Sequence, residues 1–250
     1  MTETQPIAVR DRLIVPLDVP DFAQAQTLVE TLGDAVSFYK VGLELLLSGG
    51  GFRGEFAGMM DWLVSRDKKV MVDLKLFDIG RTVAAAVGQL AGRGATFVTV
   101  HGNDEILRAA VEAAGTVQVL AVTVLTSLDQ KDMEDLGFQT DIGKLVLSRA
   151  RRAVALGCAG VVASGLEVGK LRQEIGARFL AVIPGVRPGL NKEVDTGTTY
   201  QDDQKRIVTI DEAFAGGADY VVVGRPIRSA ADPRAAAEDI QGRIARRFAG

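Results

Sequence analysis

Short apolar runs alternate with helical patterns along the whole chain, and this alternation restricts the possible folds more than any other feature. Most of the runs are continuously apolar rather than strictly alternating, as expected of a parallel sheet covered by helices. Eight runs are predicted to be strands: RLIVPL (12–17), SFYKV (37–41), KVMVDL (69–74), TFVTV (96–100), VQVLAVTVL (117–125), GVVAS (160–164), RFLAVI (178–183) and YVVVG (220–224).

Between the runs, apolar residues recur at three- and four-residue spacing, which predicts helices. Examples are DFAQAQTLVETLG (21–33), GRTVAAAVGQLAGRG (80–94) and DIGKLVLSRARRAVALG (141–157), with Asp21 as an N-cap and Gly33, Gly94 and Gly157 as stops. Eight strand-then-helix units in 250 residues fit an α/β fold of the (β/α)8 TIM-barrel type. An open, doubly wound sheet is the alternative. We expect one barrel domain over residues 12–250, after a short leader over residues 1–11.

Composition excludes several classes of function. The net charge of −3 lacks the basic surplus of a nucleic-acid-binding protein, and no apolar run approaches the roughly 20 residues of a membrane span. The N-terminus MTETQPIAVRDR has no apolar signal core, so we expect a cytoplasmic protein. A single cysteine and a single histidine exclude a disulfide and a cysteine- or histidine-rich metal site, so we predict no metal and no cofactor.

Polar residues gather where the predicted strands end, which is the edge of a barrel that carries its active site. The strand ends supply these candidates in chain order: Asp18, Lys40, Asp73 with Lys75, His101, Thr126 with Ser127, Arg187, and Arg225. A random scatter of polar residues would not place each candidate at the end of a predicted strand.

Three charges lie close together in DLKLFDIGRTV (73–83), after the third predicted strand. Alternate residues of a strand share a face, so Asp73 and Lys75 are expected to point the same way. An acid and an ammonium side by side at a strand end indicate a preorganised charge site. Asp78 lies beyond the strand on a loop and is free to point elsewhere.

These residues resemble one family, the orotidine 5′-monophosphate decarboxylases. The resemblance covers nearly the whole chain, through LDVP (17–20), FYKVG (38–42), DLKLFDI (73–79), LTS (125–127), IPGVRPG (183–189), DDQKRIVT (202–209) and VVVGRPI (221–227). The Asp-x-Lys-x-x-Asp core is shared with the 3-keto-gulonate phosphate decarboxylases, whereas DDQKRIV and GRPI are more specific. Gly80-Arg81 stands where the family commonly has Pro-Asn, and Ile210-Asp211 where it commonly has Thr-Pro.

The resemblance implies a cofactor-free enzyme of de novo pyrimidine biosynthesis that converts orotidine 5′-monophosphate (OMP) to UMP and CO2. Lys75 would protonate C6 of the pyrimidine and stabilise the developing carbanion, and Asp73 would face the departing carboxylate. Lys40 and Asp78 would extend an alternating array of charges. His101 receives no proton-transfer role, because Lys75 already supplies the proton.

The same resemblance implies how the substrate is held. Asp18 and Lys40 would contact the ribose, Thr126 and Ser127 the pyrimidine edge, and Arg225 with Gly224 the phosphate, a group that arginine and backbone N–H donors suit. Further substrate contacts are expected from Pro184, Arg187 and Gln204. A homodimer is implied as well, in which Asp78, Ile79 and Thr82 complete the pocket of the neighbouring subunit.

Two alternatives remain open from the sequence. A related phosphosugar decarboxylase would form an enediolate and require Mg²⁺, and Glu44 is the only additional acid near the second predicted strand. A catalytically inactive nucleotide-binding barrel would be indicated by loss of the lysine or of an aspartate, and neither is lost.

Overall fold

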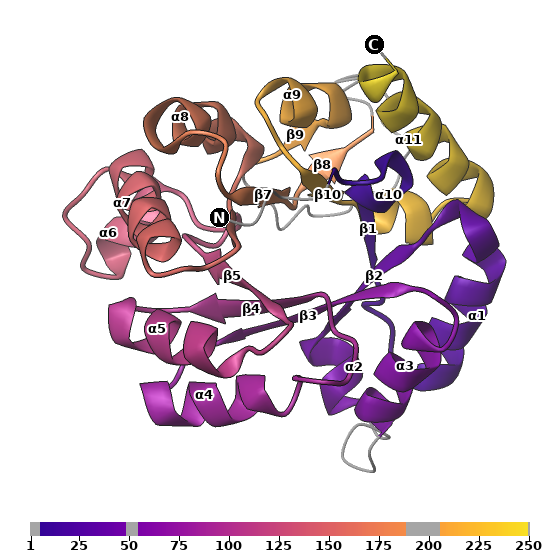
Figure 1. Cartoon of the computed structure of the whole chain (residues 1–250). Coiled ribbons are helices and arrows are strands. Elements are labelled where there is room, and N and C mark those ends of the chain that lie inside the picture. Colours follow the sequence, from indigo (N-terminus) through magenta and orange to yellow (C-terminus); the bar gives the residue numbers. More distant parts are fainter. Residues whose placement is uncertain (1–5, 49–54, 189–205, 250) are drawn as a thin grey trace.

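Eight parallel strands close into a barrel, which confirms the predicted TIM-barrel fold (Figure 1). The structure is a computed structural model that describes residues 6–48, 55–188 and 206–249. The barrel strands are β1 (Leu13–Pro16), β2 (Phe38–Gly42), β3 (Lys69–Leu76), β4 (Phe97–His101), β5 (Gln118–Val122), β6 (Gly160–Val162), β7 (Leu180–Ile183) and β10 (Tyr220–Val222). Each strand pairs with its neighbours in chain order, and β10 closes the ring against β1. A separate two-stranded ladder joins β8 (Val186–Arg187) to β9 (Val208–Thr209).

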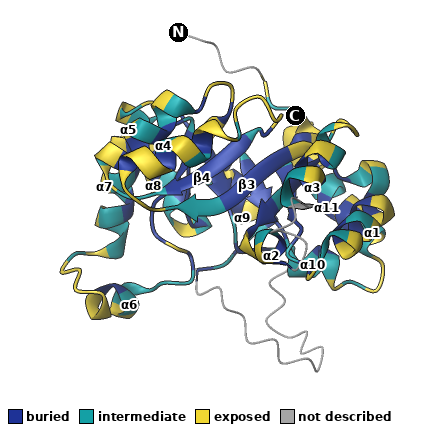
Figure 2. Cartoon of the chain, turned by 90° about the horizontal axis from the view of Figure 1, so that it is seen from below, coloured by how far each residue is buried: buried dark blue, intermediate teal, exposed yellow. Residues whose placement is uncertain are grey.

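Helices surround the barrel, and their exposed faces point away from the buried strands (Figure 2). They are α1 (Phe22–Leu32), α2 (Leu43–Leu47), α3 (Glu55–Val64), α4 (Gly80–Gly88), α5 (Asp104–Ala113), α6 (Gln130–Asp135), α7 (Ile142–Ala155), α8 (Gly165–Ile175), α9 (Ile210–Ala215), α10 (Arg225–Arg228) and α11 (Pro233–Phe248). Two 3-10 turns are η1 (Val9–Arg12) and η2 (Gly33–Ala35). Among the described residues, no helix combines the length and the apolar character needed to cross a membrane.

Local sequence explains both ends of α1. Asp21 caps α1 by accepting from the Gln24 amide at 2.8 Å, as predicted, and Gly33 ends that helix with φ of 55°. The helix predicted over 80–94 is too long, because α4 ends at Gly88 and turns follow. Gly94 is a turn residue with φ of 76°, and a Cβ there would lie 2.9 Å from Val64.

The fifth predicted strand, 117–125, is also too long. The regular strand ends at Val122, and residues 123–125 continue as a loop. The Thr123 hydroxyl donates to the Val162 carbonyl at 3.1 Å, and the Thr123 carbonyl accepts from Arg149 at 2.6 Å. The Thr123 amide also donates to the Val162 carbonyl at 3.2 Å, so side-chain bonds supplement the last backbone bond to β6. Apolar character alone therefore did not reveal where the strand stops.

The first described turn packs against the barrel. Residues 9–11, which we predicted to lie in a leader, belong to η1, and Asp11 is only 5% exposed. The Asp11 carboxylate accepts from the Ser37 hydroxyl at 2.6 Å and pairs with Lys69 at 2.6 Å. Burial works to raise the pKa of Asp11, but the bonds from Lys69 and Ser37 outweigh it and hold the pKa below its ordinary value. This contact ties η1 to the starts of two barrel strands.

The barrel interior is filled by its own set of side chains, distinct from the larger core between strands and helices. Phe38, Phe97 and Tyr220 pack against one another near the strand starts, with ring centroids 5.3–5.8 Å apart. Because side chains alternate along a strand, the column that begins with Phe38 continues with Lys40. In the same way Met71 is followed by Asp73, and Phe97 by Thr99. An apolar floor thus lies beneath polar groups at the strand ends.

Candidate active site

The carboxyl ends of the strands surround a cavity of about 670 Å³. Its lining includes ten of the predicted site residues: Asp18, Lys40, Asp73, Lys75, Thr126, Ser127, Pro184, Arg187, Gly224 and Arg225. Met71, Val162 and Val222 belong both to this lining and to the cluster inside the barrel. The site therefore lies directly on the packed barrel interior.

The end of β3 brings Asp73 and Lys75 together. The Lys75 ammonium donates to the two Asp73 oxygens at 3.0 and 2.9 Å, so the two side chains share a face as predicted. The pairing register with β4 shifts between Val72 and Leu76, and Lys75 has φ of 47°. A left-handed lysine is uncommon and costs on the order of 1–2 kcal/mol. Strain of this kind, where the surrounding structure maintains it, is typical of functional sites.

Thr99 on β4 holds this irregular strand end. Its hydroxyl accepts from the Lys75 backbone amide at 2.9 Å and donates to Asp73 at 2.9 Å. Thr99 is fully buried, and sequence reasoning did not single it out. Thr99 lies two residues after Phe97, so strand alternation alone would have placed its side chain inside the barrel. The irregular end of β3 that Thr99 supports cannot be recognised from a strand pattern.

Four charges form a continuous array across three strands. Lys40 lies 3.0 Å from Asp18 and 3.3 Å from Asp73, which in turn contacts Lys75 at 2.9 Å. Burial works to raise the pKa of Asp73, but Lys40 and Lys75 outweigh it, and the net pKa is lowered. Burial works to lower the pKa of Lys40, but Asp73 and Asp18 outweigh it, and the net pKa is raised. Both groups are therefore held in their charged forms.

A second part of the cavity lining, the arginine wall of Arg187, Arg225 and Arg228, is basic. Arg187 ends β8, and Arg225 and Arg228 lie on α10, one helical turn apart and on the same face. Arg228 was missed by the sequence analysis, although its three-residue spacing from Arg225 placed it on the cavity side once α10 was known. Its buried Nη1 has no hydrogen-bond partner among the described residues. A Cβ on Gly224 would lie 2.9 Å from Pro16, so this close approach favours glycine.

Charge is distributed unevenly over this lining. Among the lining residues that the structure describes, five basic side chains face three carboxylates, with Glu44 as the third acid beside Asp18 and Asp73. The alternating array is balanced within itself, so the positive surplus comes from the arginine wall. The cavity suits a ligand with an anionic tail.

The remaining predicted residues lie elsewhere. Asp78, Ile79 and Thr82 are exposed and do not line the cavity of their own chain. The Asp78 carboxylate accepts from the Ile79 amide at 2.6 Å, and Ile79 is 69% exposed. Gln204 falls outside the described residues.

His101 lines a separate cavity of about 360 Å³ with Phe77 and Arg149. Its Nδ1 lies 2.8 Å from the Val122 carbonyl, and burial lowers its pKa. No group of three or more cysteine, histidine, aspartate or glutamate side chains in the described part of the chain could hold a metal ion.

Comparison with known proteins shows the family to which the chain belongs. Residues 11–240 match the family described as orotidine 5′-phosphate decarboxylase / HUMPS. A Methylococcus capsulatus protein named orotidine 5′-phosphate decarboxylase is 59% identical over 98% of this chain and 96% of its own length. A protein of the same name from Afipia carboxidovorans is 48% identical, over 98% of this chain and 99% of its own.

A solved structure shares the fold. The crystal structure of orotidine 5′-phosphate decarboxylase from Lactobacillus acidophilus has a TM-score of 0.78 and 33% identity, and the match covers 94% of this chain and 99% of that one. Family match, full-length relatives and barrel architecture agree with the resemblance seen in the motifs. The chain therefore belongs to the orotidine 5′-phosphate decarboxylase / HUMPS family.

Proposed function

We propose that this protein is a carboxy-lyase that converts OMP to UMP and CO2 without a cofactor, as a step of de novo pyrimidine biosynthesis in the cytoplasm. The observation that carries the proposal is the Asp73–Lys75 pair, held at 2.9 Å by Thr99 and Lys40 inside the barrel cavity. The relatives named for this activity support it.

The charge distribution gives the substrate its orientation. OMP carries a carboxylate and a phosphate, about three negative charges at neutral pH. Its phosphate fits the wall of Arg187, Arg225 and Arg228, since guanidinium groups bind phosphate oxygens with paired donors. Its pyrimidine then reaches the Asp73–Lys75 pair, beside Thr126 and Ser127, and its ribose lies near Asp18 and Lys40.

Decarboxylation breaks the bond between C6 and the carboxylate and leaves the electron pair on C6. A fixed ammonium at that carbon stabilises the developing charge without reorganisation. In our proposal Lys75 does this and then transfers its proton to C6, so that UMP forms and CO2 leaves. Asp73 keeps Lys75 oriented and faces the departing carboxylate, and repulsion between two such charges 4 Å apart is about 4 kcal/mol at an effective dielectric near 20.

We also propose that the enzyme works as a homodimer with shared sites. Asp78, Ile79 and Thr82 lie outside the cavity of their own chain, at an exposed loop and helix start. Phe77 and Ile79, on either side of Asp78, are 68% and 69% exposed. Two large apolar side chains exposed on one loop are typical of a surface that contacts another protein. A two-fold interface over this loop would bury them and carry Asp78 to the partner's cavity.

The test is an assay on metal-stripped protein. OMP is added in the presence of a strong chelator, and loss of its ultraviolet absorbance is followed. Full activity under these conditions supports the proposal. OMP turnover that the chelator abolishes and Mg²⁺ restores would overturn the cofactor-free proposal. If OMP is left unchanged, Mg²⁺-dependent release of CO2 from 3-keto-gulonate phosphate would favour the phosphosugar decarboxylase, and no turnover of either compound would favour an inactive binding barrel.

A further inference from the structure

The loop after β5 carries Thr126 and Ser127 to the cavity. Its backbone stays joined to β6 at Thr123, whose amide donates to the Val162 carbonyl at 3.2 Å, and the strand ladder does not continue beyond that residue in the described part of the chain. Two carbonyls of this loop accept from one side chain, Arg206. The Arg206 Nη2 lies 3.0 Å from the Leu125 carbonyl and 3.3 Å from the Val124 carbonyl. Arg206 comes from a distant part of the chain, just before β9, and it does not line the cavity.

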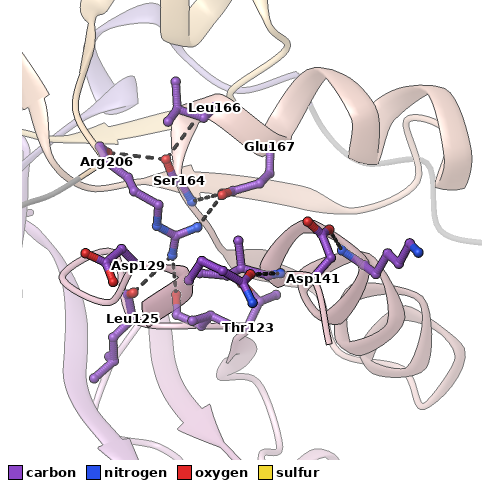
Figure 3. A network of polar contacts seen from close by, with 12 residues as sticks. Thr123, Leu125, Asp129, Asp141, Ser164, Leu166, Glu167 and Arg206 are labelled. Atoms are coloured by element: carbon purple, nitrogen blue, oxygen red, sulfur yellow. Dashed lines mark hydrogen bonds and ion pairs between the residues drawn. The ribbon is translucent and has the colours of Figure 1, made fainter. Parts of the chain in front are cut away.

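A buried acid holds Arg206 in place. The Arg206 Nη1 donates to Oε1 of Glu167, and the two side chains are only 8% and 14% exposed. Figure 3 shows the guanidinium group between Glu167 on one side and the Leu125 backbone on the other. Burial raises the pKa of Glu167, and Arg206 opposes this by favouring the carboxylate. Each charge is therefore stabilised by the other in a desolvated site.

Glu167 is itself fixed by the start of α8. Its Oε2 accepts from the Ser164 amide at 3.0 Å, as the third helical residue of a capping box. The Ser164 hydroxyl donates to the Arg206 carbonyl at 3.3 Å and accepts from the Leu166 amide at 3.2 Å. The end of β6, the start of α8 and Arg206 thus form one hydrogen-bonded network that contacts the loop after β5.

We propose that Arg206 is a positioning residue that sets the place of Thr126 and Ser127, and through them the fit of the pyrimidine. The inference rests on the proposed function, because it concerns the base end of the same cavity. A guanidinium fork can donate to a carboxylate and to two carbonyls at once, whereas a lysine ammonium offers one compact charge. The geometry of Arg206, beyond its charge, is therefore required.

The chain offers a matched control in Arg172. Its Nη2 pairs with Asp219 at 2.5 Å, and its Nε and Nη1 donate to the carbonyls of Gly217 and Phe179 at 2.9 and 2.7 Å. This is the same arrangement of one carboxylate and two carbonyls. It lies where β7 and β10 begin, at the end of the barrel opposite the cavity.

The experiment compares Arg206→Lys with Arg172→Lys. Melting temperature and kcat/KM for OMP are measured for both and for the wild type. We expect both variants to lose melting temperature, but only Arg206→Lys to lose kcat/KM, by about 10- to 100-fold, because small misplacements of binding groups cost that much. Equal kcat/KM in the two variants would overturn the inference.

A double-mutant cycle separates positioning from general damage. If Arg206 acts through the loop, the effects of Arg206→Lys and Ser127→Ala on the free energy from kcat/KM should be strongly non-additive in the double variant. The effects of Arg206→Lys and Arg225→Ala should simply add. Additivity with both partners would overturn the inference. Glu167→Gln, which keeps Arg206, should reduce kcat/KM in the same direction.

Folding failures are also informative. If Arg206→Lys does not fold, Glu167→Gln takes its place in the comparison. If neither folds while Arg172→Lys does, the network serves folding and the positioning role is wrong. If the wild-type protein leaves OMP unchanged, the proposed function is overturned. If the wild type is active and Arg206→Lys and Arg172→Lys have equal kcat/KM, this inference alone is overturned.

Discussion

At the scale of single residues, Lys75 combines a proposed chemical role with an unfavourable backbone. Its φ of 47° is one that glycine adopts freely and other residues rarely do. Lys75→Ala should abolish nearly all turnover, since it removes the proton donor, while Asp73 keeps its contact with Lys40. Turnover is measured with OMP, and folding by circular dichroism. A variant that keeps a tenth of the wild-type kcat would exclude Lys75 as the donor.

The backbone strain at Lys75 can be tested separately from its chemistry. Lys75→Gly should be at least as stable as Lys75→Ala, which reverses the roughly 0.5–1 kcal/mol penalty that glycine carries in an ordinary strand. The free energy of unfolding of both variants is measured with denaturant. An alanine variant clearly more stable than the glycine variant would show that this backbone is not strained.

Arg225 and Arg228 should contribute unequally to capture of the phosphorylated substrate. Arg225→Ala should lower kcat/KM by a factor that corresponds to a few kcal/mol of lost transition-state stabilisation, given about 1.5–3 kcal/mol per charged hydrogen bond. Arg228→Ala should lower kcat/KM by a smaller factor. Both variants should discriminate less between OMP and the phosphate-free nucleoside. Arg93→Ala, which removes an exposed arginine outside the cavity, is the control. Unchanged discrimination in both cavity variants would place the phosphate elsewhere.

At the scale of elements, η1 is fastened by Asp11. Its pKa is lowered, so the stabilisation it provides is present above the ordinary pKa of an aspartate and is lost as the pH falls through the lowered value. Asp11→Asn should therefore cost about 1–3 kcal/mol at neutral pH, where the bonds from Lys69 and Ser37 are lost or weakened. Denaturant unfolding at neutral and acidic pH checks this. A cost that does not shrink in acid would contradict it.

The regular parts of the strands could be predicted from the sequence, and their irregular ends could not. The inward register that gives Phe38 then Lys40, and Met71 then Asp73, follows from strand alternation, so the barrel and the charged rim were predictable. The register shift in β3 and the loop at residues 123–125 were not, because side-chain bonds from Thr99, Arg149 and Arg206 determine them. Such bonds join residues far apart in sequence and leave no periodic signal.

At the scale of the whole molecule, the proposed shared sites make a quantitative prediction. An inactive Asp78→Ala protein is mixed with an inactive Lys75→Ala protein, and subunits are allowed to exchange. In a mixed dimer one site carries both substitutions and the other neither, so about a quarter of the wild-type activity should return at equal mixing with random exchange. Activity is followed with OMP, and exchange with differently tagged subunits. Exchange without recovered activity would assign Asp78 to its own subunit.

The apolar floor of the barrel has a consequence for ionic strength. Phe38, Phe97 and Tyr220 fill the interior beneath the charged array and close this end of the barrel to mobile ions, which approach the array from the mouth of the cavity at the strand ends. Once substrate fills that mouth, dissolved salt screens its interaction with Asp73 and Lys75 very little. The attraction between the arginine wall and the incoming anion acts through solvent, so salt screens it strongly. Added salt should therefore slow substrate binding but leave the reaction rate of the bound complex almost unchanged. In steady-state kinetics, kcat/KM should fall as the salt concentration rises while kcat stays nearly constant.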